Sequence, residues 1–454
     1  MKFKITLIVV VCAVFITNAQ MKKWTLEECV LYAVDNNLSI EQFELDLENA
    51  KIDKSDAIGN LLPSLNGDAR LTENLGLSFN PTSQEPVSTQ LNFTGNVTSV
   101  LNIFDGLRNI KQFQRAKLNA ISNQYRLDDL KDDIRLNVAT AYLQVLSNKE
   151  SLKVSKAQYA VTEQDLNRTK ELVESGVLPR GDLLEIEATA ATQEQQIVNG
   201  EGLVLISRIN LAQLLQITDY ENFDIADESF DVPPSDIVNN SPKVIFEKAL
   251  TFRNDIKFSQ SGVDLAEKDL EISKGAYYPT LSAFINYNTR YSDQNLVPTA
   301  FDANGNPTDF SIIPFTDQLY LFDGLAYGFS LNVPLFNGWS TRNGVKRSKI
   351  GVERAKLQLE QDKLALETNI QQAHVDVTTS SKTYEAAQKT VDARRLAYEY
   401  AKERYDAGLL NAFDFGQAQA RVDNAEASLI NAKYDYIFRI KILEFFYGIP
   451  LSLD

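Results

Sequence analysis

The chain has 454 residues and a formal net charge of −16, so it lacks the basic surplus that proteins binding nucleic acid usually carry. It contains one histidine, His374, which excludes a metal site built from several histidines. We therefore predict no nucleic-acid partner, no metal site and no cofactor.

Residues 1–19 have the organisation of a secretory signal peptide, which is removed from the mature chain. Lysines precede an apolar run at 5–16, and Ala19 supplies a small residue at the expected cleavage site. Cleavage there leaves Cys29 as the only cysteine, so we predict no internal disulfide and a buried position for Cys29 on a helix. No later apolar run is long enough to cross a bilayer as a helix.

The remaining chain contains the same pattern twice. Three pairs of short segments match: 103–106 with 335–338, 175–178 with 407–410, and 62–65 with 278–281. The first two pairs are offset by 232 residues and the third by 216, so the second copy has 16 extra residues between Pro279 and Gly338. A period this long indicates a duplicated domain whose two copies fold alike.

Each copy is predicted to contain a helix, a β-hairpin, a very long helix, a tip turn and a further helix. Repeat 1 covers 20–230, with the hairpin at 64–104, the long helix at 107–174, the tip turn at 175–181 and the last helix at 182–216. Repeat 2 covers 231–454, with these elements at 280–336, 339–406, 407–413 and 414–447.

The hairpin segments alternate apolar and polar residues, which is typical of strands with one apolar face. Runs of about 11–16 residues are long enough to cross a bilayer as tilted strands. The 16 extra residues fall in a turn-rich loop at 292–323, where insertions cost little. Four strands cannot close a membrane barrel alone, because single-chain barrels need about eight. The strands therefore form either a sheet against helices in water or a barrel shared between subunits.

The long helices carry heptad repeats, which predict coiled coils. Neither Pro nor Gly occurs in 107–174, and a helix of that length would extend about 100 Å. The seam positions are Val138, Val145, Leu152, Tyr159, Leu166 and Val173 in the first copy, and Ile370, Val377, Tyr384, Val391, Tyr398 and Tyr405 in the second. The simplest alternative use of such a hairpin is as a spacer.

A glycine turn follows each long helix. Gly176 and Gly408 supply the left-handed residue that ends a helix, and Asp182 and Asp414, six residues later, are predicted to cap the next one. Apolar pairs follow both glycines, at 177–178 and 409–410. Apolar residues at the tip of a long hairpin suggest a docking surface.

These motifs, in this order and in duplicate, resemble the TolC family of outer-membrane efflux proteins of Gram-negative bacteria. Further markers are Trp-Thr-Leu-Glu-Glu at 24–28, Arg-Asn-Asp at 253–255 and Leu-Pro-Ser-Leu at 62–65. The resemblance implies a mainly α fold with transmembrane β-structure. In it, the four strands of each chain in a homotrimer close one twelve-stranded barrel in outer-membrane lipid, above a periplasmic α-barrel. It also implies two partners, a periplasmic adaptor and an inner-membrane transporter.

The resemblance assigns roles to residues at both tips. The adaptor-docking turns correspond to Gly176, Val177, Leu178, Gly408, Leu409 and Leu410. The gate positions correspond to Asp182, Tyr405, Asp414 and Gln417. In the family, a tyrosine–aspartate hydrogen bond helps to close the tip, and by position this link is Tyr405 with Asp182 here. Rings of aspartate also close it, at the positions of Asp414 and Gln417, and an arginine occupies the position of Leu410. This chain therefore has fewer gate charges than the family pattern.

The function favoured by the sequence is a passive export duct of a tripartite efflux or type I secretion system. An enzyme with a coiled-coil arm is disfavoured, because the chain has no Gly-rich phosphate loop, histidine triad or Cys/His metal spacing, and we predict no catalytic residue. A non-transport structural or adhesive envelope protein is the remaining alternative. It gives no reason for four amphipathic strands in duplicated hairpins.

Overall fold

The computed structural model describes residues 23–79, 86–227, 231–232 and 235–449. The predicted signal peptide lies outside these residues. The chain divides into two compact units. Unit 1 comprises Met1–Leu47, Asn123–Ser259 and Gln358–Asp454, and unit 2 comprises Glu48–Ser122 and Gln260–Leu357. The longest helices pass from one unit into the other.

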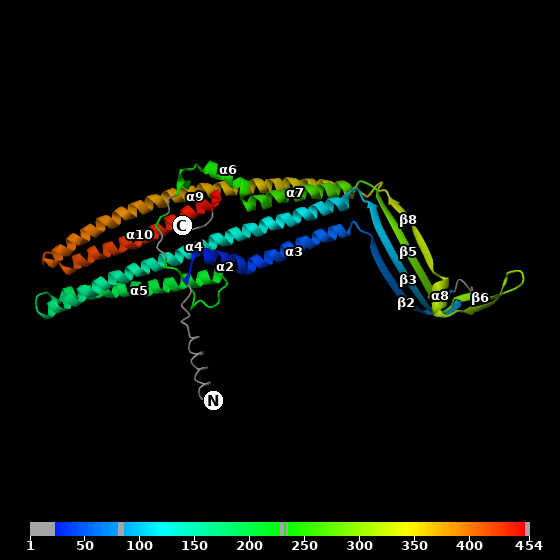
Figure 1. Cartoon of the computed structure of the whole chain (residues 1–454), viewed down its shortest axis with the longest axis horizontal. Coiled ribbons are helices and arrows are strands. Elements are labelled where there is room, and N and C mark those ends of the chain that lie inside the picture. The colour runs from blue at the N-terminus through cyan, green and yellow to red at the C-terminus, as the bar shows by residue number, and fades with distance from the viewer. Residues whose placement is uncertain (1–22, 80–85, 228–230, 233–234, 450–454) are drawn as a thin grey trace, which may run out of the picture. The chain divides into compact units, whose positions relative to one another are not determined.

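Unit 2 is built on a four-stranded antiparallel sheet with strand order β2-β3-β5-β8 (Figure 1). Its strands are β2 (Ser64–Phe79), β3 (Pro86–Phe104), β5 (Thr280–Ser292) and β8 (Gly324–Asn332). Each hairpin of the duplicated pattern supplies two neighbouring strands, and β3 pairs with β5 to join the two copies. The predicted second hairpin extends to 336, but pairing ends at Asn332. Pro334 follows closely, and proline has no N–H to donate to a ladder.

The register of the sheet separates an apolar face from a polar face. One row across the sheet contains Gly67, Val97, Tyr287 and Leu325, and the next row contains Asp68, Asn96, Asn288 and Gly324. Large side chains of the apolar face, such as Leu71, Tyr327 and Phe329, are exposed in this single chain. The sheet therefore presents an uncovered apolar surface over much of its length.

The segment 292–323 is more ordered than the predicted turn-rich loop, and this part of the prediction was wrong. It contains a second antiparallel pair, β6 (Leu296–Phe301) with β7 (Pro307–Ile312), and a short helix, α8 (Phe315–Leu321). The turn between β6 and β7 is organised by Asp302, whose carboxylate accepts from the N–H groups of Asn304 and Asn306 at 2.8 Å. Turn-forming residues mark the ends of these elements, but the sequence has no period long enough to reveal them.

Both hairpins connect to their long helices through the same backbone conformation. The helices are α4 (Arg108–Glu174) and α9 (Ser340–Asp406). Before α4, Gly106 and Leu107 have φ values of 73° and 63°, and the corresponding glycine and tryptophan before α9 have 61° and 64°. At Gly106 a Cβ atom would lie 2.2 Å from the carbonyl oxygen of Gly275, so only glycine fits there.

In unit 2 the long helices pack beside α3 (Leu38–Gly59) and α7 (Asn254–Gly275). Ser261 Oγ donates to Ser122 Oγ at 2.7 Å, which joins α7 to α4. A second hydroxyl pair, Ser273 with Ser348 at 2.7 Å, joins α7 to α9. Small hydroxyl residues at these contacts let the helices approach closely.

Unit 1 fully buries the first two positions of the predicted heptad seam on each long helix. Val138 and Val145 of α4 are fully buried beside Tyr142, in a core that includes Cys29, as predicted, and Ile437. The other helices of this unit are α2 (Leu26–Asn36), α5 (Arg180–Leu214), α6 (Pro242–Phe252) and α10 (Ala412–Tyr447). Short elements are β1 (Lys23–Trp24), β4 (Asp224–Ile225) and η1 (Asp236–Asn239).

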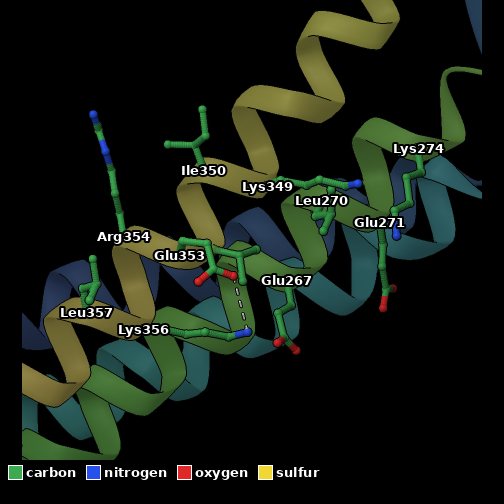
Figure 2. A pocket seen from close by; sticks show the side chains of 11 residues that line it. Glu267, Leu270, Glu271, Lys274, Lys349, Ile350, Glu353, Arg354, Lys356 and Leu357 are labelled. Atoms are coloured by element: carbon green, nitrogen blue, oxygen red, sulfur yellow. Dashed lines mark ion pairs between the residues drawn. The ribbon is translucent and has the colours of Figure 1, made fainter.

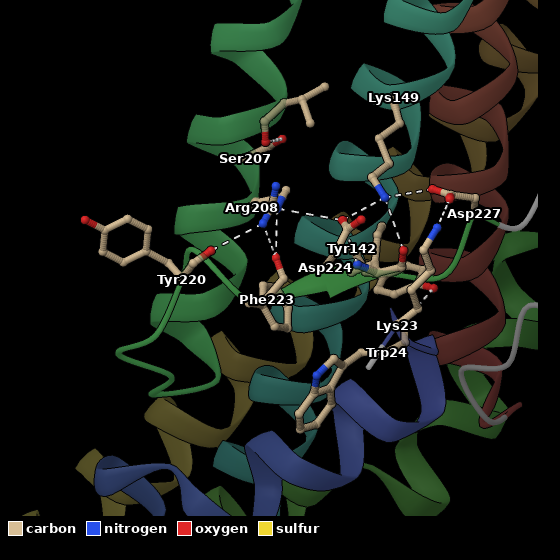
Figure 3. A network of polar contacts seen from close by, with 12 residues as sticks. Lys23, Trp24, Tyr142, Lys149, Ser207, Arg208, Tyr220, Phe223, Asp224 and Asp227 are labelled. Carbon is tan, nitrogen blue, oxygen red and sulfur yellow. Dashed lines mark hydrogen bonds and ion pairs between the residues drawn. The ribbon is translucent and has the colours of Figure 1, made fainter. Parts of the chain in front are cut away.

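The parallel pair β1–β4 holds the first described residues against the helices of unit 1 (Figure 3). Lys149 of α4 contacts Asp224 at 2.7 Å and Asp227 at 2.8 Å, and its ammonium also donates to the carbonyl of Ile225. Tyr142 Oη donates to the carbonyl of Trp24 at 3.2 Å. These contacts fasten both strands to α4.

The Arg-Asn-Asp motif at 253–255 lies at the break between α6 and α7. Arg253 is nearly buried, donates to Asp255 at 2.8 Å and lies over the ring of Phe445. Asn254 donates to Asp132 of α4 at 2.9 Å. The motif therefore fixes the helix break by tying it to α4 and α10.

No helix within the described residues is long and apolar enough to cross a membrane.

Candidate functional site

The two tip turns, both in unit 1, have the same geometry. Gly176 and Gly408 have φ values of 78° and 71°, the left-handed conformation that favours glycine. The N–H groups of Gly176 and Val177 donate to carbonyls of the preceding turn at 3.0 and 2.8 Å, and those of Gly408 and Leu409 do so at the same distances. This is the Schellman arrangement, which satisfies the last carbonyls of a helix and reverses the chain.

Each turn exposes large apolar side chains. Val177 is 67% exposed and Leu409 is 71% exposed, whereas Leu178 and Leu410 are half-buried. One further exposed residue, not predicted from the sequence, extends each surface: Leu184 beside the first turn and Phe413 beside the second. The signal that could have identified them is a large apolar residue in the first turns of the helix that follows each glycine.

The predicted capping roles of Asp182 and Asp414 were wrong. The helix α5 begins two residues earlier than predicted, and its cap residue is Pro179, whose carbonyl accepts from the Asp182 N–H at 3.1 Å. The cap of α10 is Asn411, whose side chain accepts from the Asp414 N–H at 2.8 Å. Asn411 also donates to the Asp414 carboxylate at 3.1 Å, which holds this exposed carboxylate at the start of α10.

Tyr405 lies in an aromatic stack and not in a polar link. Its ring stacks on Phe415 with centroids 4.7 Å apart and planes 5° apart, and Tyr398 stacks against the same ring at 5.5 Å. The Tyr405 hydroxyl is buried and has no hydrogen-bond partner among the described residues. The predicted Tyr405–Asp182 hydrogen bond is therefore not formed in this chain.

An ion pair that was not predicted from the sequence joins the long helices α4 and α9 near the tips. Arg168 Nη1 of α4 lies 2.8 Å from Asp406 Oδ1 at the end of α9. Both side chains are partly exposed, so the pair contributes at most about 1 kcal/mol. One turn earlier, burial raises the pKa of the Asp165 carboxyl, an effect that Lys402 opposes. No sequence pattern distinguishes these charges from others on the helices.

The interior behind the tips contains polar contacts between helices. Gln419 of α10 donates to the Thr162 hydroxyl of α4 at 2.6 Å, and both side chains are buried. Gln193 of α5 donates to the Asp423 carboxylate at 2.8 Å. Gln417 is exposed, and its side-chain oxygen accepts from Arg421 at 3.3 Å. No cluster of His, Cys, Asp or Glu suited to a metal ion occurs in the part of the chain that the structure describes.

Asp423 is expected to make stability depend on pH. Burial raises the pKa of its carboxyl to about 6, although Gln193 opposes the shift. An unfolded Asp titrates near pH 4, so the folded state binds more protons between about pH 4 and 6. The contribution of this carboxyl is thus most favourable at low pH and is lost as the pH rises through about 6.

We therefore expect Asp423→Asn to raise the melting temperature at pH 7 and to change it little at pH 4. Asparagine stays neutral and can still accept from Gln193. Thermal unfolding followed by circular dichroism in detergent measures this. An equal shift at both pH values would show that the carboxyl does not titrate in this range.

Comparison with known proteins identifies the class. The sequence matches the family described as "Outer membrane efflux protein" over residues 32–215 and 245–439. These segments cover most of the chain and correspond to its two repeats. The chain therefore belongs to the outer membrane efflux protein family, and the resemblance predicted from its motifs is confirmed. It is a protein of the outer membrane that extends into the periplasm.

Individual relatives are distant. The outer membrane protein TolC of Vibrio cholerae is 23% identical over 306 residues, which cover 67% of this chain and 65% of that protein. The chain thus spans slightly less than two thirds of that relative. The alkaline protease secretion protein AprF of Pseudomonas aeruginosa is 22% identical over 347 residues, 76% of this chain and 67% of that protein.

A solved structure shows the fold. The Campylobacter jejuni CmeC outer membrane channel matches with a TM-score of 0.78 at 18% identity, covering 93% of this chain and 85% of that one. This match confirms the predicted fold class of long helical hairpins joined to a four-stranded sheet.

Proposed function

We propose that three copies of this chain form a passive export duct through the outer membrane, driven by an inner-membrane pump through a periplasmic adaptor. The chain catalyses no reaction in this proposal. The observation that carries it is that two helices, α3 and α9, each have two opposite apolar stripes, of which the chain buries only one.

The first doubly apolar helix is α9. Its buried stripe contains Val352 and Leu359, while Ile350 and Leu357 are exposed, Leu357 by 64%. Residues two positions apart on a helix differ by about 200°, so the exposed stripe lies opposite the buried one. Figure 2 shows Ile350 and Arg354 on the outer side of α9, where they line a shallow groove together with Glu267 and Glu271 of α7.

The second is α3, which has the same organisation. Ile40 and Leu47 are buried against α4, whereas Leu38, Leu45 and Ile52 are exposed at heptad spacing. Burying a leucine contributes about 1.5–3 kcal/mol, so two such stripes favour association with further copies. Within unit 2, hydroxyl contacts join α4 to α7 and α7 to α9. A head-to-tail contact between the exposed stripe of α3 in one copy and that of α9 in the next would generate a ring.

The sheet supports the same association. Strands β2 and β8 each have one edge without a partner among the described residues. In lipid every backbone group needs a partner, so these edges must pair with other copies. The four strands alternate in direction, and β8 of one chain can therefore pair antiparallel with β2 of the next. Three copies would give twelve strands, which is within the range of closed membrane barrels.

Mass measurement in detergent, combined with conductance in planar bilayers, tests the proposal. We expect a trimer that conducts ions without an energy source. A stable folded monomer would contradict the shared barrel. A trimer that shows no conductance would favour the alternative, a structural or adhesive envelope protein.

We further propose that the tips form both the adaptor-docking surface and the gate. In this proposal both turns bind the adaptor, through Gly176, Val177 and Leu178 in the first and Gly408, Leu409 and Leu410 in the second. The gate region contains Asp182, Tyr405, Asp414 and Gln417. The matched exposed apolar residues of the two turns support the docking role, because exposed apolar patches mark contact sites.

Asp414 is expected to form a ring of three carboxylates at the narrow end of the duct. Such a ring attracts cations, so Asp414→Ala should weaken the block of conductance by multivalent cations. Single-channel recording with added trivalent metal complexes measures the change. Asp392→Ala is the matched control, since it removes the same charge from an exposed position on α9. Equal block in the wild type and in Asp414→Ala would assign the Asp414 carboxylate only to its contact with Asn411.

A further inference from the structure

We infer that α8 is a lipid-contacting element outside the barrel strands, seated at the boundary between the hydrocarbon and the headgroups of the outer leaflet. The inference rests on the proposed barrel, because it extends the lipid-facing surface of the sheet to a segment that contributes no barrel strand.

The docking of α8 onto the sheet is specific. Phe315 stacks edge-on against Tyr291 at 4.9 Å and against Phe93 at 5.4 Å, and these two residues are register partners on β5 and β3. Thr289 Oγ1 donates to the carbonyl of Leu319 at 2.7 Å. Figure 1 shows α8 beside the end of the sheet at which β5 leaves it.

One fully buried side chain fixes α8 to the end of β5. Gln318 accepts from the N–H of Ser292 at 3.1 Å and donates to the carbonyl of the same residue at 3.0 Å. It also donates to the carbonyl of Ile313 at 3.1 Å. A glutamine amide used in this way completes the strand's hydrogen bonding and holds the helix in one place.

The face of the sheet that α8 covers is the apolar face. Phe93, Thr289 and Tyr291 lie an even number of residues from Val97 and Tyr287 along their strands. They therefore lie on the same face of the sheet as these two residues, which belong to the exposed apolar rows. The polar rows lie on the opposite face. In a closed barrel the apolar face contacts lipid and the polar face lines the channel. The helix therefore lies on the lipid side of the proposed barrel and not in its lumen.

The level of α8 along the strand corresponds to a membrane boundary. Leu281 and Tyr291 are ten residues apart on β5, which is about 33 Å at about 3.3 Å per residue. A strand tilted by about 40° then covers about 25 Å along the membrane normal, the usual height of the apolar band. Tyr277 and Tyr278 lie just before β5, so aromatic residues flank the band at both ends, as in the girdles of membrane barrels.

The outward surface of α8 suits a boundary position. Tyr320 is 81% exposed, Leu321 is also exposed, and Asp317 lies between them around the helix. Tyrosine is enriched at the boundary of membranes, and an aspartate there remains hydrated. No Lys or Arg occurs between Arg290 and Arg342, so α8 itself has no basic side chain for lipid phosphates. The contact is with the acyl–headgroup boundary itself.

Nitroxide labels at single cysteines test the inference in trimers reconstituted into vesicles. Tyr320→Cys reports on α8, Tyr327→Cys on the apolar face of β8, and Asn304→Cys on the polar β6–β7 turn, all in a Cys29→Ala background. Power saturation compares collisions with oxygen, which enters hydrocarbon, and with a water-soluble nickel chelate. We expect the oxygen-to-nickel ratio at position 320 to be severalfold above that at 304 and below that at 327, because position 327 lies in the middle of the apolar band and position 320 at its boundary.

The outcomes separate the inference from the proposed function. A water-type ratio at 320 with a lipid-type ratio at 327 overturns the inference and leaves the barrel intact. Water-type ratios at both positions overturn the proposed barrel. Repeating the measurement with zwitterionic lipid alone should leave the ratio at 320 unchanged. A ratio that becomes lipid-type only with anionic lipid would contradict contact through the apolar boundary.

Discussion

Replacing Val177 and Leu409 together with aspartate is expected to abolish export while leaving trimer formation and membrane insertion intact. These two residues are the most exposed apolar side chains of the tip turns. Neither takes part in the core of unit 1, so the fold tolerates their replacement. A carboxylate in their place would have to be desolvated on docking, which costs several kcal/mol without a partner charge. Accumulation of an export substrate inside cells measures the effect.

Two control variants separate docking from folding. Ser175→Asp adds the same charge at the same turn without removing an apolar side chain, and we expect it to retain export. Val177→Ala with Leu409→Ala keeps the turn neutral and removes apolar area, so export should fall without being lost. Normal export in the double aspartate variant would show that the turns only reverse the chain.

Periodic features of the chain were predictable from the sequence because they repeat over long stretches. The heptad seam placed Val138, Val145, Ile370 and Val377 on one face of each long helix, and all four are fully buried. The duplicated glycine turns were predictable for a related reason. A left-handed residue at the end of a helix favours glycine, and the glycine at 176 recurs at 408, at the 232-residue offset of the repeat.

The details of the candidate gate were not predictable, because they depend on helix boundaries and on contacts between helices. Asp182 was expected to cap α5, but the helix starts at Arg180, and a shift of two residues removes that role. Tyr405 was expected to hydrogen-bond across the hairpin, but its ring stacks on Phe415, a contact between α9 and α10 that no spacing along one helix reveals.

The same limit explains the missed order in the 292–323 segment. Its strands are six residues each and α8 is seven residues long, which is too short for a period to emerge. The position of α8 is determined by the bonds of Gln318 to Ser292 and by the stacking of Phe315, and both are tertiary contacts. Short elements of this kind are stabilised by the sheet beneath them, since an isolated turn of helix is marginal in water.

Leu357→Asp is expected to prevent assembly of the trimer. The side chain lies in the middle of the exposed stripe of α9, opposite the stripe that packs within the chain. A trimer would bury three copies of it, each contributing about 1.5–3 kcal/mol, and the variant would replace them with three carboxylates in an apolar contact. Leu45→Asp should have the same effect through the exposed stripe of α3. Mass measurement in mild detergent distinguishes monomer from trimer.

The controls for this result use the same helix. Gln358→Asp adds the same charge one position along, about 100° around α9 from the stripe, and should leave the trimer intact. Leu357→Met keeps the apolar volume and should also assemble, because volume-conserving swaps usually cost less than about 1.5 kcal/mol. Circular dichroism of the Leu357→Asp monomer should show that its helices remain, since the buried stripe of Val352 and Leu359 is unchanged. If Leu357→Asp and Leu45→Asp both form normal trimers, the exposed stripes do not join the subunits, and the ring must be closed by the sheet edges alone.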